Sequence, residues 1–440
     1  MKRKMNIRTV LEVLCVFACL DLRLTECKKK EDDAFNVGIN DTPDFQASKP
    51  VRYLLYNVNP GEGFNLRRDV YIRVANLVKL LNDDEPWALV LPPWGRIYHW
   101  QTREISQIKL PWSLFFDLES LRRHIPVLEF EEFLAVSEKP MIEEVYYLQR
   151  YKEGWTKWEE KMDIRECLDK HGYSKGKDSR WHHWFFGYGD DVYANKFECM
   201  SYMGHAGFIK PFLMHNSSAR SVFLDRAESL IHGQYSEWSP LYWSGRRSMV
   251  FAKHLRDIGD NFREKYLGST DKKDKTVLDD WTKMNKKHGD AKGGPYLAIH
   301  LRRKDYLYAH GEEIPSIQYV PKKVKSILEK HKLKKVFVAT DSPDAEFEYL
   351  KQEFGEKVEV YRFKPTPEEH EKYKDGGVAI IDQWICAHAR YFIGSYVSTF
   401  SFRIQEEREI LGFEPEMTFN RLCNDDNDTC EQPSKWTIKY

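Results

Sequence analysis

Short apolar runs alternate with helical patterns near the start of the chain. The run Tyr53–Val58 precedes a turn cluster at 59–63, and apolar residues then recur at helical spacing over 66–81. The next run, Trp87–Leu91, is continuously apolar, as in a parallel strand that is covered on both faces. The pattern predicts strand, glycine-rich loop, helix and strand, with Asn65 capping the helix. This is the start of a doubly wound sheet.

The same rhythm returns in the last third of the chain, whereas residues 105–290 show no legible period. The polar stretch 266–293 predicts a connecting segment. Beyond it we predict strands and helices in alternation, at Tyr296–His300, Tyr319–His331, Lys335–Ala339, Pro343–Phe354, Val358–Arg362, Gly377–Ala389, Tyr391–Gly394 and from about Ser401. The fold class is therefore α/β, with two Rossmann-like doubly wound domains facing each other across a cleft. The expected segments are 1–26 (signal peptide), 27–50 (mobile arm), 51–265 (first domain), 266–293 (connection), 294–403 (second domain) and 404–440 (C-terminal helix and disulfide loop).

Composition excludes several classes of protein. Of the 440 residues, 42% are hydrophobic and 31% are charged, which is typical of a folded chain rather than a disordered one. The 68 basic residues balance 68 acidic ones, so neither nucleic acid nor an anionic membrane is an expected partner.

The N-terminus has the pattern of a secretory signal. Basic residues within 1–8 precede an apolar run at 10–20 that is too short to span a membrane, and no longer apolar run follows. Sequons at Asn40, Asn216 and Asn427 predict glycosylation sites. We therefore expect a luminal or secreted protein without a membrane span.

Six cysteines remain after the signal segment. Cys423 and Cys430 flank a short polar segment and predict a disulfide loop, and Cys167 and Cys199 predict a second disulfide. A metal site is the alternative for the second pair, because His182 and His183 lie between its cysteines. Cys386 lies in an apolar helical pattern and is expected to be a buried free thiol.

The loops at the carboxyl ends of the predicted strands carry the candidate chemistry. In NPGEGFN, Gly61 and Gly63 let the backbone approach a ligand, and Glu62 between them is either a solvated turn residue or a base for a hydroxyl group. In HLRRKD, the cations Arg302, Arg303 and Lys304 follow a strand, which predicts either a diphosphate site or a solvated basic loop.

The last loop and the helix before it are less specific evidence for a function. Ser398, Thr399 and Ser401 lie at a helix start, where hydroxyl groups either hold an anion or cap the helix. Asp382, on an otherwise apolar helix, either accepts the paired N–H donors of guanine or faces solvent, and its helix position alone favours solvent. The one Asp-x-Asp pattern, at Asp426 and Asp428, lies between two cysteines and overlaps a sequon, so a metal-independent mechanism is the working hypothesis.

Several long motifs, taken in order, resemble one family. VRYLLYNVNPGEGFNLRRDVYIR, LVLPPWGRIYHWQ, YLAIHLRRKDY, VFVATDS and GGVAIIDQWICAHARYFIGSYVSTFSFRIQEEREILGF are similar to the GDP-fucose protein O-fucosyltransferases, and to their type 2 members above all. The resemblance covers about residues 52–430. It implies a GT-B architecture, without a cofactor or metal. The implied reaction is an inverting transfer of fucose from GDP-fucose to Ser or Thr of folded thrombospondin type 1 repeats in the endoplasmic reticulum.

The resemblance also implies roles for individual residues. Glu62 would be the catalytic base, Asp382 would bind guanine, and Arg302 would bind the diphosphate. The acceptor-binding positions would be Trp100, Asp305 and Glu407. The remaining donor-binding positions would be Gly61, Gly63, Phe64, Asn65, His300, Ser398, Thr399 and Phe400.

Two alternatives stay open. The chain could be a fucosyltransferase for EGF-like repeats or N-glycan cores, because the donor loops could be shared. It could also be a luminal lectin or folding monitor without turnover, although binding alone has no need of a base such as Glu62.

Overall fold

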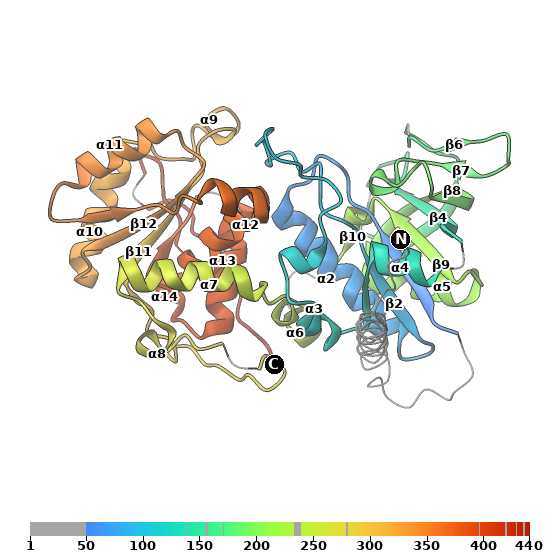
Figure 1. Cartoon of the computed structure of the whole chain (residues 1–440), viewed down its shortest axis with the longest axis horizontal. Helices are drawn as coiled ribbons and strands as arrows, with labels where there is room; N and C mark the ends of the chain where they lie inside the picture. Colours follow the sequence, from blue (N-terminus) through green and yellow to red (C-terminus); the bar gives the residue numbers. More distant parts are fainter. Residues whose placement is uncertain are drawn as a thin grey trace, which may run out of the picture. The chain divides into compact units, whose positions relative to one another are not determined.

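Two sheets of mainly parallel strands organise the chain (Figure 1). The computed structural model describes residues 50–440 except 138, 155, 156, 170, 233–238, 279, 396, 419, 428, 434 and 435. The predicted signal peptide, the arm up to residue 49 and the sequon at Asn40 lie outside the described residues.

The first sheet has ten strands, most of them in the order β3-β2-β1-β9-β4-β8-β7-β6, with β5 and β10 also paired to β8. Strands β1, β2, β3, β4, β8 and β9 pair in parallel, and β5, β6 and β7 join antiparallel at the far edge. The strands are β1 (Arg52–Tyr56), β2 (Trp87–Leu91), β3 (Val127–Glu129), β4 (Met141–Gln149), β5 (Lys161–Arg165), β6 (Ser174–Lys175), β7 (Trp181–His182), β8 (Tyr193–His205), β9 (Ser221–Asp225) and β10 (Leu230–Ile231). Most of these strands lie in the part of the sequence that showed no legible period.

The second sheet is all parallel, in the order β13-β12-β11-β14. Its strands are β11 (Gly294–Leu301), β12 (Lys335–Thr340), β13 (Glu359–Tyr361) and β14 (Ala389–Ile393). Alternate residues of β11 belong to different cores. Ile299 shares a core with Val324 of α10 (Tyr319–His331) and Leu350 of α11 (Asp344–Phe354), whereas Ala298 shares one with Ile381 of α12 (Pro367–Ala387). Helices therefore cover both faces of this sheet (Figure 1), which confirms the predicted doubly wound pattern.

The longer helices are α2 (Phe64–Leu81), α6 (Pro240–Ser248), α7 (Lys253–Phe262), α10 (Tyr319–His331), α11 (Asp344–Phe354), α12 (Pro367–Ala387) and α13 (Thr399–Leu411). Shorter ones are α3 (Leu118–Arg122), α4 (Phe130–Val136), α5 (Lys210–His215), α8 (Asp271–Asp274), α9 (Tyr306–Ala309) and α14 (Pro415–Thr418), together with the single turns η1 (Trp112–Leu114), η2 (Phe185–Gly187), η3 (Ala206–Ile209), η4 (Ala227–Ser229) and η5 (Arg263–Leu267).

Two helix starts differ from the prediction. Gly63, not Asn65, is the N-cap of α2, because the Asn65 side chain accepts hydrogen bonds from other side chains instead of a backbone N–H. Helix α12 begins about ten residues before the predicted Gly377, where Thr366 and Glu369 form a reciprocal capping box. Lys374, at φ 62°, kinks the helix between the two parts.

The polar stretch 266–293 is less exposed than its composition predicts. Trp281 and Met284 are only 5% exposed, because they pack into the core although charged residues surround them in sequence. The strands of the two sheets fall within the predicted 51–265 and 294–403, respectively. The domain boundaries and the cleft stay predictions, since residues 51–440 form one continuous unit.

Candidate active site

In the second sheet the strand order β13-β12-β11 reverses once, between β11 and β14. In the first sheet β2 and β3 lie on one side of β1 and the later strands β9, β4 and β8 on its other side, so the order changes direction between β1 and β9. Open α/β sheets bind ligands at this point, beyond the carboxyl ends of the strands. The loops with Glu62, Arg302 and Ser398 follow β1, β11 and β14, so the candidate residues lie where the topology predicts a site.

The loop after β1 is fixed by hydrogen bonds and presents a carboxylate. The Glu62 N–H donates to Asn59 O over 2.9 Å, and Arg67 Nε donates to Glu62 O over 3.0 Å. The Asn59 N–H donates to Glu228 Oε2 over 3.0 Å. The Glu62 carboxylate is half-buried and accepts no hydrogen bond from any described residue. An unpaired carboxylate on a fixed loop is well suited to accept a proton.

Helix α2 starts beside this carboxylate. No side chain caps its N-terminus at Gly63, so the first N–H groups stay open to a ligand. Gly61 faces open space, whereas a Cβ on Gly63 would stand 3.1 Å from His99 Cδ2. Phe64 is buried against Trp100, with 5.7 Å between the ring centroids.

Arg302, after β11, is held by two acceptors. Its Nε and Nη2 donate to the two carboxylate oxygens of Asp305 over 3.0 and 2.6 Å. Nη2 also lies 3.3 Å from His99 Nε2. Nη1 makes no hydrogen bond with a described residue, so one edge of the guanidinium is available to an anion.

The other two cations of this loop differ from Arg302. Arg303 is buried and pairs with Glu346 at 3.1 Å, and its Nη1 donates to Pro315 O. Lys304 is exposed. The predicted cradle of three cations is therefore reduced to Arg302, because Arg303 is used to hold the loop itself.

His300 joins the loop after β11 to the start of α13. Its Nδ1 lies 2.8 Å from Ser401 Oγ, and its ring stacks on Phe400 at 4.3 Å. Burial, and then the charge of Arg302, lower the pKa of His300 to about 3, so the imidazole is neutral. In this position the neutral ring joins the end of β11 to the start of α13.

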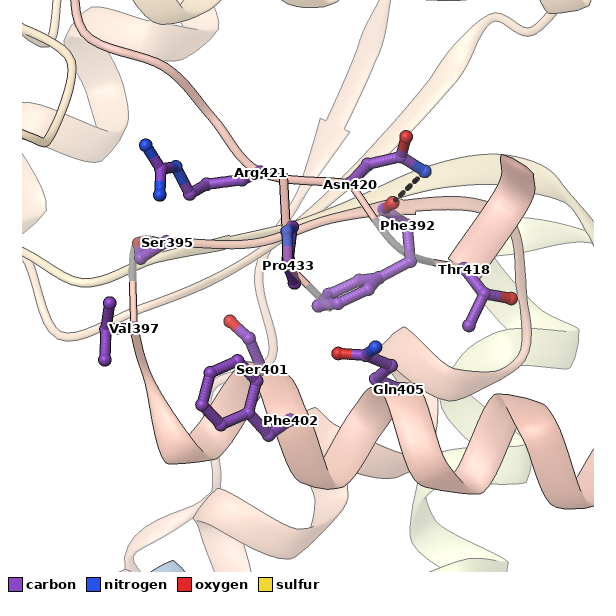
Figure 2. A pocket seen from close by; sticks show the side chains of 10 residues that line it. All are labelled: Phe392, Ser395, Val397, Ser401, Phe402, Gln405, Thr418, Asn420, Arg421 and Pro433. Atoms are coloured by element: carbon purple, nitrogen blue, oxygen red, sulfur yellow. Dashed lines mark hydrogen bonds between the residues drawn. The ribbon is translucent and has the colours of Figure 1, made fainter. Parts of the chain in front are cut away.

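Ser398 is fully buried at the N-cap of α13, and its side chain makes no cap hydrogen bond. Val397 before it has φ 39°, a conformation that is rare for a β-branched residue. The Tyr306 hydroxyl donates to Val397 O over 3.2 Å and helps to hold this backbone. Figure 2 shows the small pocket behind the segment, where Ser395 and Val397 face Ser401 and Phe402 of α13.

Asp382 does not face solvent freely, which corrects the preference drawn from its helix position. Its Oδ1 is buried and accepts no hydrogen bond from the described residues. Burial raises the pKa of Asp382 to about 8, although the nearby Arg362 opposes the shift. An orphaned carboxylate oxygen of this kind is available to ligand N–H donors.

Beside the site, hydrogen bonds between side chains join helix α2 to helix α12. Gln383 Nε2 donates to Asn65 Oδ1 over 2.9 Å and to Phe400 O over 3.3 Å. The buried Arg68 donates to Gln383 Oε1 over 2.8 Å. Asn65 and Phe400, which lie far apart in sequence, are thus brought together by Gln383, and their role in donor binding stays a prediction.

The three expected acceptor positions differ in their surroundings. Trp100 is half-buried and packs on α12, where a Cβ on Gly376 would stand 2.6 Å from its ring. Asp305 holds Arg302. Glu407 is only 7% exposed and pairs with the buried Arg246 at 2.9 Å. Their acceptor roles stay predictions, and the Glu407 carboxylate is already used inside the protein.

Sequence reasoning missed His99 and Gln383, which make the contacts between the loops. Their partners, Arg302 and Asn65, lie 203 and 318 residues away in sequence. No local spacing reports such a contact.

Both predicted disulfides are present, Cys167–Cys199 and Cys423–Cys430, and Cys386 is a buried free thiol. The first disulfide overturns the alternative of a metal site. Within the described residues, no three His, Cys, Asp or Glu side chains converge as metal ligands.

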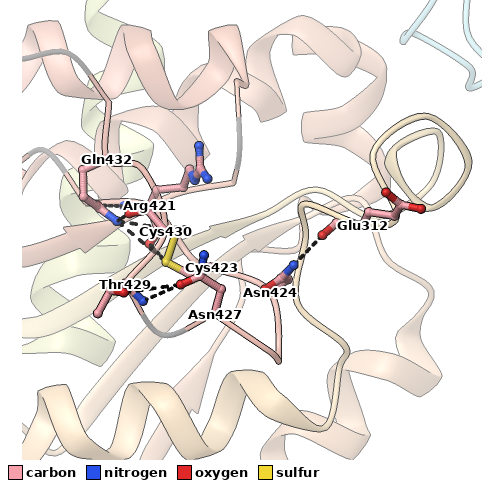
Figure 3. Close-up of a disulfide and its surroundings, with 8 residues drawn as sticks. All are labelled: Glu312, Arg421, Cys423, Asn424, Asn427, Thr429, Cys430 and Gln432. Carbon is pink, nitrogen blue, oxygen red and sulfur yellow. Dashed lines mark hydrogen bonds between the residues drawn. A yellow bond between two sulfur atoms is a disulfide. The ribbon is translucent and has the colours of Figure 1, made fainter.

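Figure 3 shows the C-terminal disulfide, with Asn424 beside it pointing to Glu312. Beside Cys423, Asn424 Nδ2 donates to Glu312 O over 2.6 Å, and the Leu422 N–H donates to Gly394 O over 3.0 Å. The disulfide loop is thereby joined to the segments that follow both β11 and β14. The sequon residues Asn216 and Asn427 are exposed, as glycosylation requires.

Comparison with known proteins identifies the family of the chain. A family model described as GDP-fucose protein O-fucosyltransferase matches residues 53–411. The chain belongs to this family. It is 55% identical over 397 residues to GDP-fucose protein O-fucosyltransferase 2 of Homo sapiens, with 90% of this chain and 91% of the relative covered. The protein of the same name from Caenorhabditis elegans is 50% identical, with 91% and 93% covered. The one from Drosophila melanogaster is 34% identical, with 90% and 84% covered.

Solved structures agree on the fold. The crystal structure of POFUT1 in complex with GDP-fucose has a TM-score of 0.55 and 18% identity, covering 86% of this chain and 99% of that one. POFUT1 in complex with GDP gives a TM-score of 0.54 at 18% identity, with the same shares covered. At this identity the likeness shows a shared α/β architecture with two sheets.

Among the helices that the structure describes, none is long and apolar enough to cross a membrane.

Proposed function

We propose that the chain transfers fucose from GDP-fucose to a Ser or Thr hydroxyl of folded thrombospondin type 1 repeats, with inversion and without a metal ion, in the lumen of the endoplasmic reticulum. The observation that carries the proposal is the unpaired Glu62 carboxylate, whose neighbour Gly63 packs on His99 and so connects to Arg302. The names of the relatives identify the donor and the class of reaction. The two disulfides and the expected signal peptide support an oxidising, secretory compartment.

The mechanism follows from the charges that develop during the transfer. The sugar gains oxocarbenium character, the leaving GDP gains negative charge, and the acceptor hydroxyl loses a proton. In our proposal Glu62 takes that proton while the hydroxyl attacks the anomeric carbon from the face opposite the diphosphate. The free edge of Arg302 and the N–H groups at the start of α13 stabilise the departing diphosphate, and Asp382 binds guanine.

One experiment tests donor, acceptor and metal independence together. GDP release from GDP-fucose is measured with EDTA present, using a folded thrombospondin type 1 repeat, the same repeat reduced, and a folded EGF-like repeat. Release with the folded thrombospondin repeat alone supports the proposal. Release with the EGF-like repeat would favour the alternative acceptor, no release with any acceptor would favour a binding protein, and loss of release only with EDTA would show a metal requirement.

Replacing Arg302 with Lys is expected to weaken GDP binding about tenfold, the equivalent of losing one charge-assisted hydrogen bond of about 1.5 kcal/mol. The variant keeps the positive charge but loses the planar fork that bonds Asp305 and offers a second edge to phosphate. Isothermal calorimetry with GDP measures the change. Lys304→Ala, on the exposed neighbour, is the control and should leave the affinity unchanged; an equal loss in Lys304→Ala would show that Lys304 also contributes to GDP binding.

GDP affinity is expected to rise with pH up to about 8, the pKa to which burial raises Asp382, and then to level off. Guanine offers two N–H donors, so binding needs the ionised carboxylate, and below the pKa the affinity falls by up to about tenfold per pH unit. Calorimetry at several pH values measures the slope.

Asp382→Asn, which cannot ionise, should lose this slope. Because the phosphates of GDP titrate identically with both proteins, the difference between the two profiles isolates Asp382. Parallel profiles would show that Asp382 does not contact the base.

A further inference from the structure

The His99 side chain lies beside both the loop that carries Glu62 and the Arg302 guanidinium. It lies in the loop after β2, and its ring stands 3.1 Å from the position of a Cβ on Gly63, next to Glu62. Its Nε2 is 3.3 Å from Arg302 Nη2. A Cβ at position 63 would require the ring to shift by a few tenths of an ångström.

The hydrogen bond from Arg302 determines the protonation state of the His99 imidazole. A guanidinium has only N–H groups and no acceptor, so Nε2 of His99 must accept the hydrogen bond with its lone pair. The ring is therefore neutral, with its proton on Nδ1. Although the His99 side chain is exposed, partial desolvation and then the charge of Arg302 lower its pKa, and Asp305 and Asp341 partly oppose this.

The remaining hydrogen bonds of Arg302 explain what the contact achieves. Asp305 accepts from Nε and Nη2, and His99 takes the other N–H of Nη2. Two of the three nitrogens are thus held, and the orientation of Nη1 is set. The Arg302 guanidinium also lies 4.4 Å over the Tyr306 ring, and the Arg302 N–H donates to Ser395 Oγ over 2.8 Å. His99 adds to these a contact that comes from the loop after β2.

We propose that His99 is a positioning residue for fucose transfer: it orients Arg302 toward the donor diphosphate and, by packing on Gly63, sets the distance between that arginine and the Glu62 carboxylate. The proposal rests on the function proposed above. His99 acts through Arg302 and the loop, and takes no proton from the acceptor.

This role exists only while His99 is neutral. A protonated ring carries N–H groups at both nitrogens, so it would face the Arg302 guanidinium with a second positive charge and no acceptor. The charged groups around it are Arg302, Asp305 and Asp341, which lie after β11 and β12. An acidic limb in kcat/KM for GDP-fucose, below the usual range of a histidine, is the expected signature.

Two variants of His99 separate the effect of its hydrogen-bond acceptor from the effect of its side-chain volume. His99→Phe keeps a ring against Gly63 but has no acceptor, and we expect about a tenfold lower kcat/KM and a weaker GDP affinity. His99→Gln keeps an acceptor at about the place of Nε2, so it should recover most of the rate and lose the acidic limb contributed by His99.

The outcomes distinguish a failure of the proposed function from a failure of the positioning role of His99. An inactive wild type would contradict the proposed function itself, and calorimetry with GDP, which needs no turnover, would then still test the order wild type, Gln and Phe. An active wild type with equal rates in both variants, or with an unchanged acidic limb in His99→Gln, would overturn the positioning role. Thermal unfolding of both variants shows whether any loss reflects the fold instead.

Discussion

Replacing Glu62 with Gln is expected to lower the rate of fucose transfer by about 10²–10⁴-fold, the usual contribution of a general base. The amide keeps the size of the side chain and cannot take a proton. The loop should be unaffected, because it is held through the Glu62 backbone by Asn59 and Arg67 and not through the carboxylate. GDP affinity should therefore change little. GDP release with the folded acceptor measures the rate, and calorimetry measures the affinity.

A matched control makes this result specific. Glu104→Gln is the same chemical change on an exposed carboxylate in the loop after β2 and should leave the rate unchanged. If Glu62→Gln lost GDP affinity in proportion to its rate, Glu62 would be a structural residue of the loop. If its rate were unchanged, another group would have to serve as the base.

The sequence predicted what depends on short-range pattern. The strands and helices after residue 294 and the loops with Glu62 and Arg302 follow from local periodicity and from the rule that ligands bind beyond the carboxyl ends of parallel strands. Strands β3 to β10 escaped prediction, because long β8 pairs with strands of both directions and its residues face mixed surroundings.

In the candidate site, too, sequence reasoning identified what depends on local pattern and missed what depends on distant contacts. Asp382 was misjudged from its position in α12 because its burial comes from packing, which the helix pattern does not report. His99 and Gln383 could not be predicted, since each becomes significant only through a partner more than 200 residues away. The resemblance to the family supplied roles, but not the contacts that hold the loops together.

A buried ion network joins α6 to α13, the helix that begins at Ser398. Arg246, only 1% exposed, donates from Nε to Glu406 at 2.7 Å and from Nη2 to Glu407 at 2.9 Å. Glu406 also pairs with Arg403 at 3.0 Å and accepts a hydrogen bond from the Tyr242 hydroxyl. Burial by itself lowers the pKa of Arg246, but the charges of Glu407 and Glu406 outweigh it and raise the pKa.

Replacing Arg246 with Met is therefore expected to lower the free energy of unfolding by about 3–5 kcal/mol, as measured by urea denaturation. The loss is large because Glu407 is left buried without its partner, whereas Glu406 keeps Arg403. Removing both charges of the pair, in Arg246→Met with Glu407→Met, should recover most of the stability.

Lys253→Ala, which breaks the exposed Lys253–Asp257 pair on α7, is the control and should change stability little. A double variant as unstable as Arg246→Met would show that packing around the arginine, rather than the stranded Glu407 charge, determines the loss. A stable single variant would show that Glu407 tolerates the loss of its partner, by taking up a proton or by contacting water, and would contradict the stranded charge as the cause.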